Sequence, residues 1–277
     1  MRIRKRSGSF RTIHNPDTVL RKYQYSILTK ILNKVKVPDY IYAFEKNKSI
    51  PQMAALHVNK AVVISIDLKD FFTSIKEKRV REAFQSLGID EAPARTLSEL
   101  CTYSAFVPQG ALTSPKIANI VTAATFGPDL KRYAEENNLV VTVYADDATF
   151  SADTRDINVR QILSDLTNII QRHGFRVNYQ KTKVMHRSRR QYVCGVVVNE
   201  KTNLLKKERN KLRAICHNVA RNGLEAEAAK NNLTASQFES HLKGKLNWFK
   251  QLNPVLGGNL ITKLNTALQA NQVTAPT

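Results

Sequence analysis

Apolar residues recur along this chain with two different periods. Runs rich in β-forming residues lie at 61–67 and 139–151, whereas apolar positions three and four residues apart dominate 19–35 and the chain after about residue 206. The first pattern is typical of strands and the second of helices with one buried face. We therefore expect strands at 61–67, 139–151, 175–179 and 191–198, all in one sheet, and helices at 76–87, 91–102, 114–137, 156–173, 206–222, 234–251 and 258–270.

Glycine and proline residues refine these boundaries. Asn15 followed by Pro16 predicts a helix start, because proline is favoured at the first helical position. The pair at 127–128 predicts a kink, and Gly174 predicts the end of the preceding helix. Residues 5–11 have the pattern of a basic hairpin with a glycine turn.

Carboxylates stand at the ends of two apolar β-runs. Asp146 and Asp147 form the turn between two strands, and Asp67 ends the run 61–67. Buried carboxylates are costly without a cation or a donor, and carboxylate oxygens are ligands of hard divalent cations. If the three acids converge, they can hold two metal ions for phosphoryl transfer. The simpler alternatives are a solvated turn at 146–147 and an acidic cap after Asp67.

The charge of the chain indicates a polyanionic partner. Lys and Arg number 43 against 23 Asp and Glu, which gives a net charge of +20 and a pI near 10.0. Basic residues are concentrated in 1–60 and 181–213, on either side of the three acids. This layout favours nucleic acid, since each neutralised phosphate releases counterions. A basic amphipathic helix of the membrane-binding kind is not evident.

Other composition signals narrow the class of protein. The 277 residues are 42% hydrophobic, enough for a sizeable core. We find neither an apolar leader nor a run of about 20 apolar residues. Cys101, Cys194 and Cys216 are odd in number and widely spaced, unlike a disulfide framework or a zinc site. We expect reduced cysteines and a cytoplasmic location.

Five motifs in order resemble those of reverse transcriptases, and most closely the bacterial retron-type branch. They comprise Asp67 with Phe71–Phe72, Pro108–Gly110, Tyr144–Asp147, and the segments 174–182 and 242–254. Two further segments agree: 10–16 resembles the finger motif that opens these proteins, and 54–57 falls where retron enzymes carry an alanine-x-x-histidine element. Residues 193–195 are Val-Cys-Gly, where retron enzymes usually show Val-Thr-Gly, in a stretch used to recognise the cognate RNA.

The resemblance implies an α+β right-hand polymerase fold. Its parts would be fingers, a palm with an antiparallel sheet backed by helices, and a helical thumb. The implied boundaries are 1–60 and 76–110 for the fingers, 61–75 and 111–200 for the palm, and 201–277 for the thumb.

The resemblance also implies the residues of the catalytic site. Asp67, Asp146 and Asp147 would be catalytic and would ligate two Mg²⁺ ions, with the Leu68 carbonyl as a further ligand. The attacking group would be a primer hydroxyl, so that catalysis is positioning and charge stabilisation.

Several residues would contact the nucleotide or the nucleic acid. From the fingers, Arg11 and Lys5 would grip the triphosphate, with Arg6 competing with Lys5. Lys181 would approach the triphosphate or act as a general acid, although a surface lysine is the alternative. The remaining candidates are Phe72, whose bulk would exclude a 2′-OH; Gln109, near nucleotide and template; Tyr144, at the primer end; and Lys243, Lys245 and Trp248 in the thumb.

Core packing is the alternative for the aromatic candidates. At least one residue of each aromatic pair, 71–72 and 248–249, is expected to be buried. Pro108 and Gly110 would shape a loop that allows close backbone approach.

Three functions fit these expectations. The first is a retron-type RNA-directed DNA polymerase that uses dNTPs to copy a structured RNA into small DNA (msDNA), in anti-phage defence, with an effector protein encoded nearby as a candidate partner. The second is another standalone defence-associated reverse transcriptase. The third is a non-catalytic RNA-binding scaffold, which would have no need of all three acids. We expect no RNase H-like domain or maturase extension after the thumb.

Overall fold

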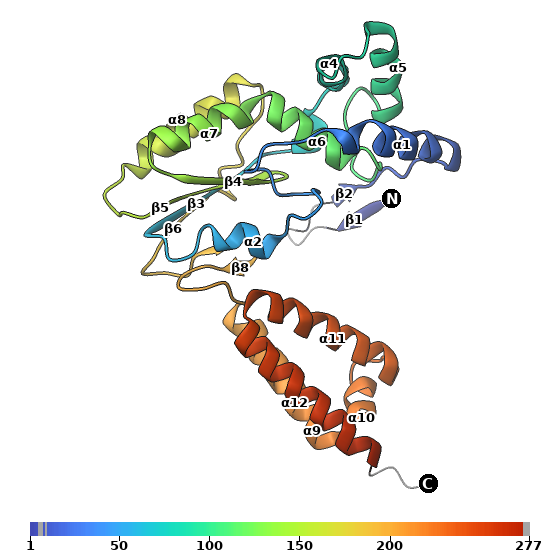
Figure 1. The fold of residues 1–277 in the computed structure, drawn as a ribbon, viewed down its shortest axis with the longest axis vertical. Helices are drawn as coiled ribbons and strands as arrows, with labels where there is room; N and C mark the ends of the chain where they lie inside the picture. The colour runs from blue at the N-terminus through green and yellow to red at the C-terminus, as the bar shows by residue number, and fades with distance from the viewer. Residues whose placement is uncertain (5–7, 9, 274–277) are drawn as a thin grey trace. The chain divides into compact units, whose positions relative to one another are not determined.

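The computed structural model describes residues 1–4, 8 and 10–273 (Figure 1). The chain forms two compact units, and each is treated by itself. The first comprises residues 1–49 and 61–186, and the second comprises 50–60 and 187–277. Both units are built from two segments, so residues 50–60 leave the first unit and join the second.

The first unit contains a four-stranded antiparallel sheet with the order β4-β5-β3-β6. Its strands are β3 (Val62–Asp67), β4 (Val140–Tyr144), β5 (Asp147–Ala152) and β6 (Lys183–His186). A separate hairpin pairs β1 (Arg2–Arg4) with β2 (Phe10–Thr12). The predicted N-terminal hairpin is therefore present, although residues 5–7 and 9 of its turn lie outside the described residues.

The helical elements of the first unit are α1 (Thr18–Lys30), the 3₁₀ turn η1 (Leu32–Lys34), α3 (Phe71–Ser74), α4 (Glu77–Ser86), α5 (Glu91–Cys101), α6 (Ser114–Ala124), α7 (Phe126–Glu136) and α8 (Val159–Arg172). Of these, α7 and α8 lie along one face of the sheet in Figure 1.

Strand alternation explains the two faces of the sheet. Val62, Ile64 and Ile66 of β3 stand opposite Ala152, Phe150 and Ala148 of β5, and all six belong to the main apolar core. Because side chains alternate along a strand, the residues between them face the other way. That second face carries Ser65 and Asp67 on β3, so the apolar packing of one face fixes where the polar groups emerge.

The second unit is mostly helical. A short hairpin pairs β7 (Tyr192–Val193) with β8 (Val196–Val197), and α2 (Ile50–Ala55) packs against β8. The thumb-like helices are α9 (Lys206–Asn222), α10 (Leu224–Ala229), α11 (Ala235–Leu252) and α12 (Pro254–Val273). Phe238, Leu242, Leu246 and Phe249 form the buried stripe of α11, as expected for apolar positions at helical spacing.

Three expectations about boundaries are wrong. Strands 175–179 and 191–198 do not close the sheet, because β6 is its fourth strand and β7–β8 is a separate hairpin. Asp17 rather than Asn15 caps α1, since its carboxylate accepts the Leu20 N–H at 2.8 Å. The helix also ends at Lys30, before the last apolar positions of the predicted run.

The long helix predicted at 114–137 is interrupted, in agreement with the predicted kink. The break falls at Thr125, two residues before Gly127, and separates α6 from α7. A side chain at position 127 would meet the Thr122 carbonyl oxygen at 2.6 Å, so the close packing here requires glycine. None of the helices in the described ranges is both long and apolar enough to span a bilayer.

Candidate active site

Three side chains of the predicted site stand in one row across the sheet. Tyr144 is the direct partner of Asp147 in the β4–β5 ladder, and Asp147 is the direct partner of Asp67 in the β5–β3 ladder. Directly opposed residues in an antiparallel pair have Cα atoms about 5 Å apart and share a face. Asp67 and Asp147 are therefore brought together from positions 80 residues apart in the sequence.

The turn between β4 and β5 places the third acid beside this row. Only Ala145 and Asp146 connect the paired residues Tyr144 and Asp147. Ala145 has φ of 54° and is buried, a left-handed conformation that costs a non-glycine residue about 1 kcal/mol. The Asp146 carbonyl accepts the Leu68 N–H at 2.7 Å, so the turn is tied to the end of β3.

The segment after α8 holds the end of β3 from the other side. The Asn178 N–H donates to the Asp67 carbonyl at 2.8 Å, and the Lys69 N–H donates to the Arg176 carbonyl at 2.7 Å. Lys181 lies on the same segment, and its Nζ is 3.1 Å from both carboxylate oxygens of Asp67. Residues 176–181 thus serve as a support for the site rather than as a strand of the sheet.

The negative charges of the three acids repel one another. Burial, followed by the neighbouring charges of Asp146 and Asp67, raises the pKa of Asp147 from 3.8 to about 6, against the lowering effect of the Ser65 hydroxyl. Burial also raises the pKa of Asp146, with Asp67 adding to the effect and Lys181 and Arg11 opposing it. A nearby cation would stabilise these carboxylates, because it favours their ionised form.

The donor set fits a divalent metal, although the side chains are not arranged as a finished metal site. Within the described ranges, no set of three or more Asp, Glu, His or Cys side chains is placed to hold a metal ion as the chain stands. Asp67 instead pairs with the Lys181 ammonium, and the Asp147 Oδ1 accepts the Ser65 hydroxyl at 3.0 Å. The Lys181 ammonium therefore supplies a positive charge beside Asp67. The oxygens of the three acids are hard ligands, the kind that Mg²⁺ prefers.

Arg11 is the finger residue with an electrostatic link to the site. It lies exposed on β2, and its charge lowers the pKa of Asp146. Lys5, the other finger candidate, and its competitor Arg6 lie outside the described residues.

The two phenylalanines after Asp67 have different environments. Phe71 is buried against Phe175, with ring centroids 5.9 Å apart, whereas Phe72 is only half-buried. The prediction that one of the pair belongs to the core is confirmed for Phe71. Phe72 packs edge-on against Phe71 and keeps part of its surface open.

The loop at 108–110 is fixed to the segment that follows β2. The Gln109 carbonyl accepts the His14 N–H at 2.8 Å, and the side chain of Gln109 is half-buried. Gly110 has φ of 114°, and a side chain there would meet the His14 carbonyl oxygen at 2.7 Å. The loop therefore packs closely against the backbone after β2, and its approach to the nucleotide and template stays a prediction.

The thumb candidates all lie on α11 in the second unit. Lys243 pairs with Glu239 at 2.6 Å, and Lys245 is exposed. Trp248 is half-buried and Phe249 is fully buried, which confirms that one aromatic of this pair is core.

Ser65 is a site residue that the sequence reasoning missed. Its hydroxyl donates to Asp147 and lowers the pKa of that carboxyl. The alternation of side chains along a strand could have predicted this residue, because Ser65 is two residues before Asp67 and so lies on the same face of the sheet.

Comparisons with known proteins show which family the sequence matches. The family model for reverse transcriptase (RNA-dependent DNA polymerase) matches residues 3–239. The chain is 35% identical to the retron Mx65 reverse transcriptase of Myxococcus xanthus over 91% of its own length and 60% of the relative's. It is 32% identical to the retron Ec86 reverse transcriptase of Escherichia coli over 76% of its own length and 65% of the relative's. An apo telomerase of Candida tropicalis aligns with a TM-score of 0.47 and 11% identity, covering 68% of this chain and 44% of that one.

An antiparallel sheet with acids at adjoining strand ends, in a mixed helix and sheet fold, is consistent with the polymerase fold. The chain belongs to the reverse transcriptase family, and its curated relatives place it with the bacterial retron type, as the motifs predicted. It spans about 60% of the length of the first of these relatives.

Proposed function

We propose that this chain is an RNA-directed DNA polymerase of retron type. It would use dNTPs to copy part of a structured RNA into small DNA (msDNA), within an anti-phage system that includes an effector protein. The observation that carries the polymerase assignment is the register that sets Asp67 opposite Asp147, with Asp146 in the adjoining turn. A scaffold that only binds RNA has no need of this cluster, in which burial and the charge of Asp67 raise the pKa values of Asp146 and Asp147.

Divalent metal ions are the general cofactors of this family, and we propose two Mg²⁺ ions here. Asp67, Asp146 and Asp147 would hold them, with the Leu68 carbonyl as an additional ligand. When bound, they supply activation of the attacking hydroxyl and stabilisation of the leaving oxygen.

Protein side chains would orient the other reactants around these acids. Arg11 and Lys5 would bind the triphosphate, and the influence of Arg11 on Asp146 supports its part in this role. Lys181 would turn from Asp67 to the nucleotide once another cation neutralises that carboxylate. With this exchange, Asp67 would be paired with a cation both before and after substrate binding.

Selectivity for dNTPs is assigned to Phe72. Its half-open position after Asp67 supports a steric block beneath the sugar, where a 2′-OH would clash. Gln109, anchored through its backbone to His14, would contact nucleotide and template.

The remaining assignments concern the nucleic acid and the domains. Tyr144 would support the primer end, and Lys243, Lys245 and Trp248 would contact the duplex from the thumb. The boundaries given for fingers, palm and thumb and the cytoplasmic location stay predictions from the sequence.

Primer extension tests this function directly. Purified protein, a primed RNA template, dNTPs and Mg²⁺ should yield DNA, and Asp146→Asn should abolish the product because it removes one carboxylate without changing the shape of the turn. Asp156→Asn, at an exposed position on the loop before α8, is the matched control. Equal extension by wild type and Asp146→Asn would remove the catalytic assignment and favour a scaffold.

Nucleic acid that copurifies with the protein tests the retron assignment. A branched RNA–DNA chimera is the expected species. Unbranched DNA or another RNA partner would instead identify a different defence-associated reverse transcriptase.

A further inference from the structure

We propose that Phe44, with Tyr144, forms an aromatic platform for the sugar and base of the primer's terminal nucleotide. This inference rests on the proposed polymerase function and adds a nucleic-acid-contacting residue to it. Phe44 belongs to the loop at 38–48, which none of the motif assignments includes.

Phe44 combines an exposed ring with an unfavourable backbone. Its side chain is 49% exposed and its φ is 60°. A left-handed conformation is costly for a bulky aromatic residue and persists only where the surrounding structure imposes it. The ring lies next to Tyr144, with centroids 6.3 Å apart and planes tilted by 40°.

Backbone pairing fixes the loop beside the catalytic hairpin. The Tyr42 N–H donates to the Val143 carbonyl at 2.9 Å, and the Val143 N–H donates to the Tyr40 carbonyl at 2.7 Å. These bonds add residues 40–42 as a short parallel edge to β4. Phe44 follows Tyr42 by two residues and Tyr144 follows Val143 by one, and because the two segments run parallel, both rings lie at the same end of the hairpin.

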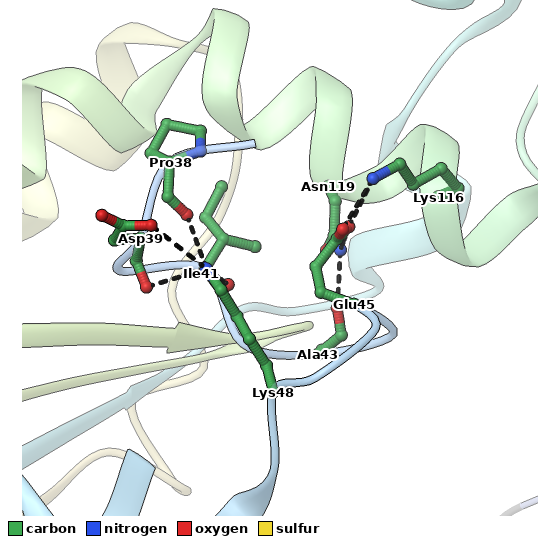
Figure 2. A network of polar contacts seen from close by, with 8 residues as sticks. All are labelled: Pro38, Asp39, Ile41, Ala43, Glu45, Lys48, Lys116 and Asn119. Carbon is green, nitrogen blue, oxygen red and sulfur yellow. Dashed lines mark hydrogen bonds and ion pairs between the residues drawn. The ribbon is translucent and has the colours of Figure 1, made fainter. Parts of the chain in front are cut away.

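A buried ion pair locks the loop onto α6 (Figure 2). The Lys116 Nζ lies 2.8 and 2.7 Å from the two carboxylate oxygens of Glu45. The Asn119 Nδ2 donates to Glu45 at 2.8 Å and to the Ala43 carbonyl at 2.6 Å. The side chains of Lys116 and Glu45 are only 7% and 14% exposed. Ala43 and Glu45, the residues on both sides of Phe44, are therefore held against α6.

Lys48 closes the other end of the loop. Its Nζ donates to three backbone carbonyls, those of Pro38, Asp39 and Ile41, at 3.1, 3.0 and 2.8 Å (Figure 2). These bonds tie the first residues of the loop to its last residue. The strained position of Phe44 is thus imposed from both sides.

A rigidly held, half-exposed ring beside the catalytic acids is suited to stacking. Aromatic side chains contact bases regardless of sequence, because every base has a π-face. The nucleotide within reach is the one whose hydroxyl must approach Asp67 and Asp147, since Tyr144 is the ladder partner of Asp147. That nucleotide is the primer terminus, and a platform there would align the hydroxyl for attack.

Equilibrium binding without dNTPs tests the platform independently of catalysis. The probe is a fluorescent RNA template, either primed with DNA or unprimed. Phe44→Ala and Phe44→Gly should raise the Kd for the primed template about tenfold, the effect expected for the loss of one stacking ring. Phe44→Tyr should stay within about twofold of wild type. Tyr25→Ala, which removes a 62% exposed ring from α1, is the matched control and should bind normally.

Thermal unfolding separates a binding role from a structural one. Glycine tolerates the left-handed backbone, so Phe44→Gly should melt no lower than Phe44→Ala while binding the primed template equally poorly. Wild-type affinity in Phe44→Gly, or an equal loss for primed and unprimed templates, would overturn the platform. A wild-type protein that binds primed template without extending it would refute the proposed polymerase function and leave this comparison intact.

Discussion

Replacing Asp147 by asparagine should stabilise the metal-free protein at neutral pH while removing activity. Asp147 is held among other carboxylates, and its pKa is raised to about 6. Asparagine keeps the shape of the side chain and an oxygen that can accept the Ser65 hydroxyl, but it carries no charge. The substitution therefore removes repulsion and desolvation cost without opening a cavity.

The magnitude follows from proton linkage. The folded chain binds the Asp147 proton more tightly than the unfolded chain, so raising the pH from about 4 to about 6 lowers stability. The loss of folding stability that comes from ionising Asp147 is absent below about pH 4 and complete above about pH 6. A pKa of about 6 against 3.8 corresponds to about 3 kcal/mol, which is the largest gain expected for Asp147→Asn at pH 7.5.

Chemical denaturation at several pH values in EDTA measures this difference. The free energy of unfolding of Asp147→Asn should exceed that of wild type at pH 7.5, and the two should converge near pH 4. Mg²⁺ should raise the stability of wild type more than that of the variant, since a bound cation offsets the same repulsion. Asp156→Asn, at an exposed position, should show neither effect. An Asp147→Asn protein that is less stable than wild type at pH 7.5 would refute the electrostatic reasoning.

Three further perturbations probe other parts of the structure. Phe72→Ala should raise rNTP incorporation relative to dNTP at least tenfold in single-nucleotide assays, and unchanged discrimination would exclude a steric role. Lys116→Met should lower the unfolding free energy by about 3 kcal/mol, because it leaves Glu45 buried without its partner; Lys131→Met, in an exposed pair, should cost under about 1 kcal/mol. Ala145→Gly should raise the unfolding free energy by about 0.5 to 1 kcal/mol by relieving the backbone at φ 54°, and a lower melting temperature would argue against strain there.

The strands that carry the three acids were predictable because their patterns are strong. The runs at 61–67 and 139–151 alternate or continue in β-forming residues, and the structure places β3, β4 and β5 there within a residue or two. Convergence of Asp67 with the 146–147 turn followed from family motifs. Only the register of the β3–β5 pairing shows that Asp67 and Asp147 are direct partners.

The support for the site was harder to predict because it depends on long-range contacts. Residues 175–179 have a strand-like composition, yet their backbone bonds go to the end of β3 instead of forming a full ladder. The true fourth strand, β6, has only four residues, and both of its end residues are exposed. A short edge strand of this kind carries little apolar signal.

The lock between Glu45 and Lys116 shows the same limit. Its members are 71 residues apart, and neither position is distinguished from an ordinary surface charge by its neighbours in the sequence. Their burial arises only when the 38–48 loop packs against α6. The strained backbone at Phe44 depends on that packing, so no local sequence pattern predicts it.

Localised backbone cleavage by bound iron tests most directly whether the three acids surround one metal centre. Fe²⁺ that replaces Mg²⁺ reduces added hydrogen peroxide to hydroxide and a hydroxyl radical, and the radical cuts the chain close to the ion; ascorbate returns the resulting Fe³⁺ to Fe²⁺. Our account predicts paired cuts near Asp67 and near Asp146–Asp147, both suppressed by excess Mg²⁺ and both lost in Asp67→Asn. Cuts near one segment alone, or cuts that persist in Asp67→Asn, would contradict a shared site.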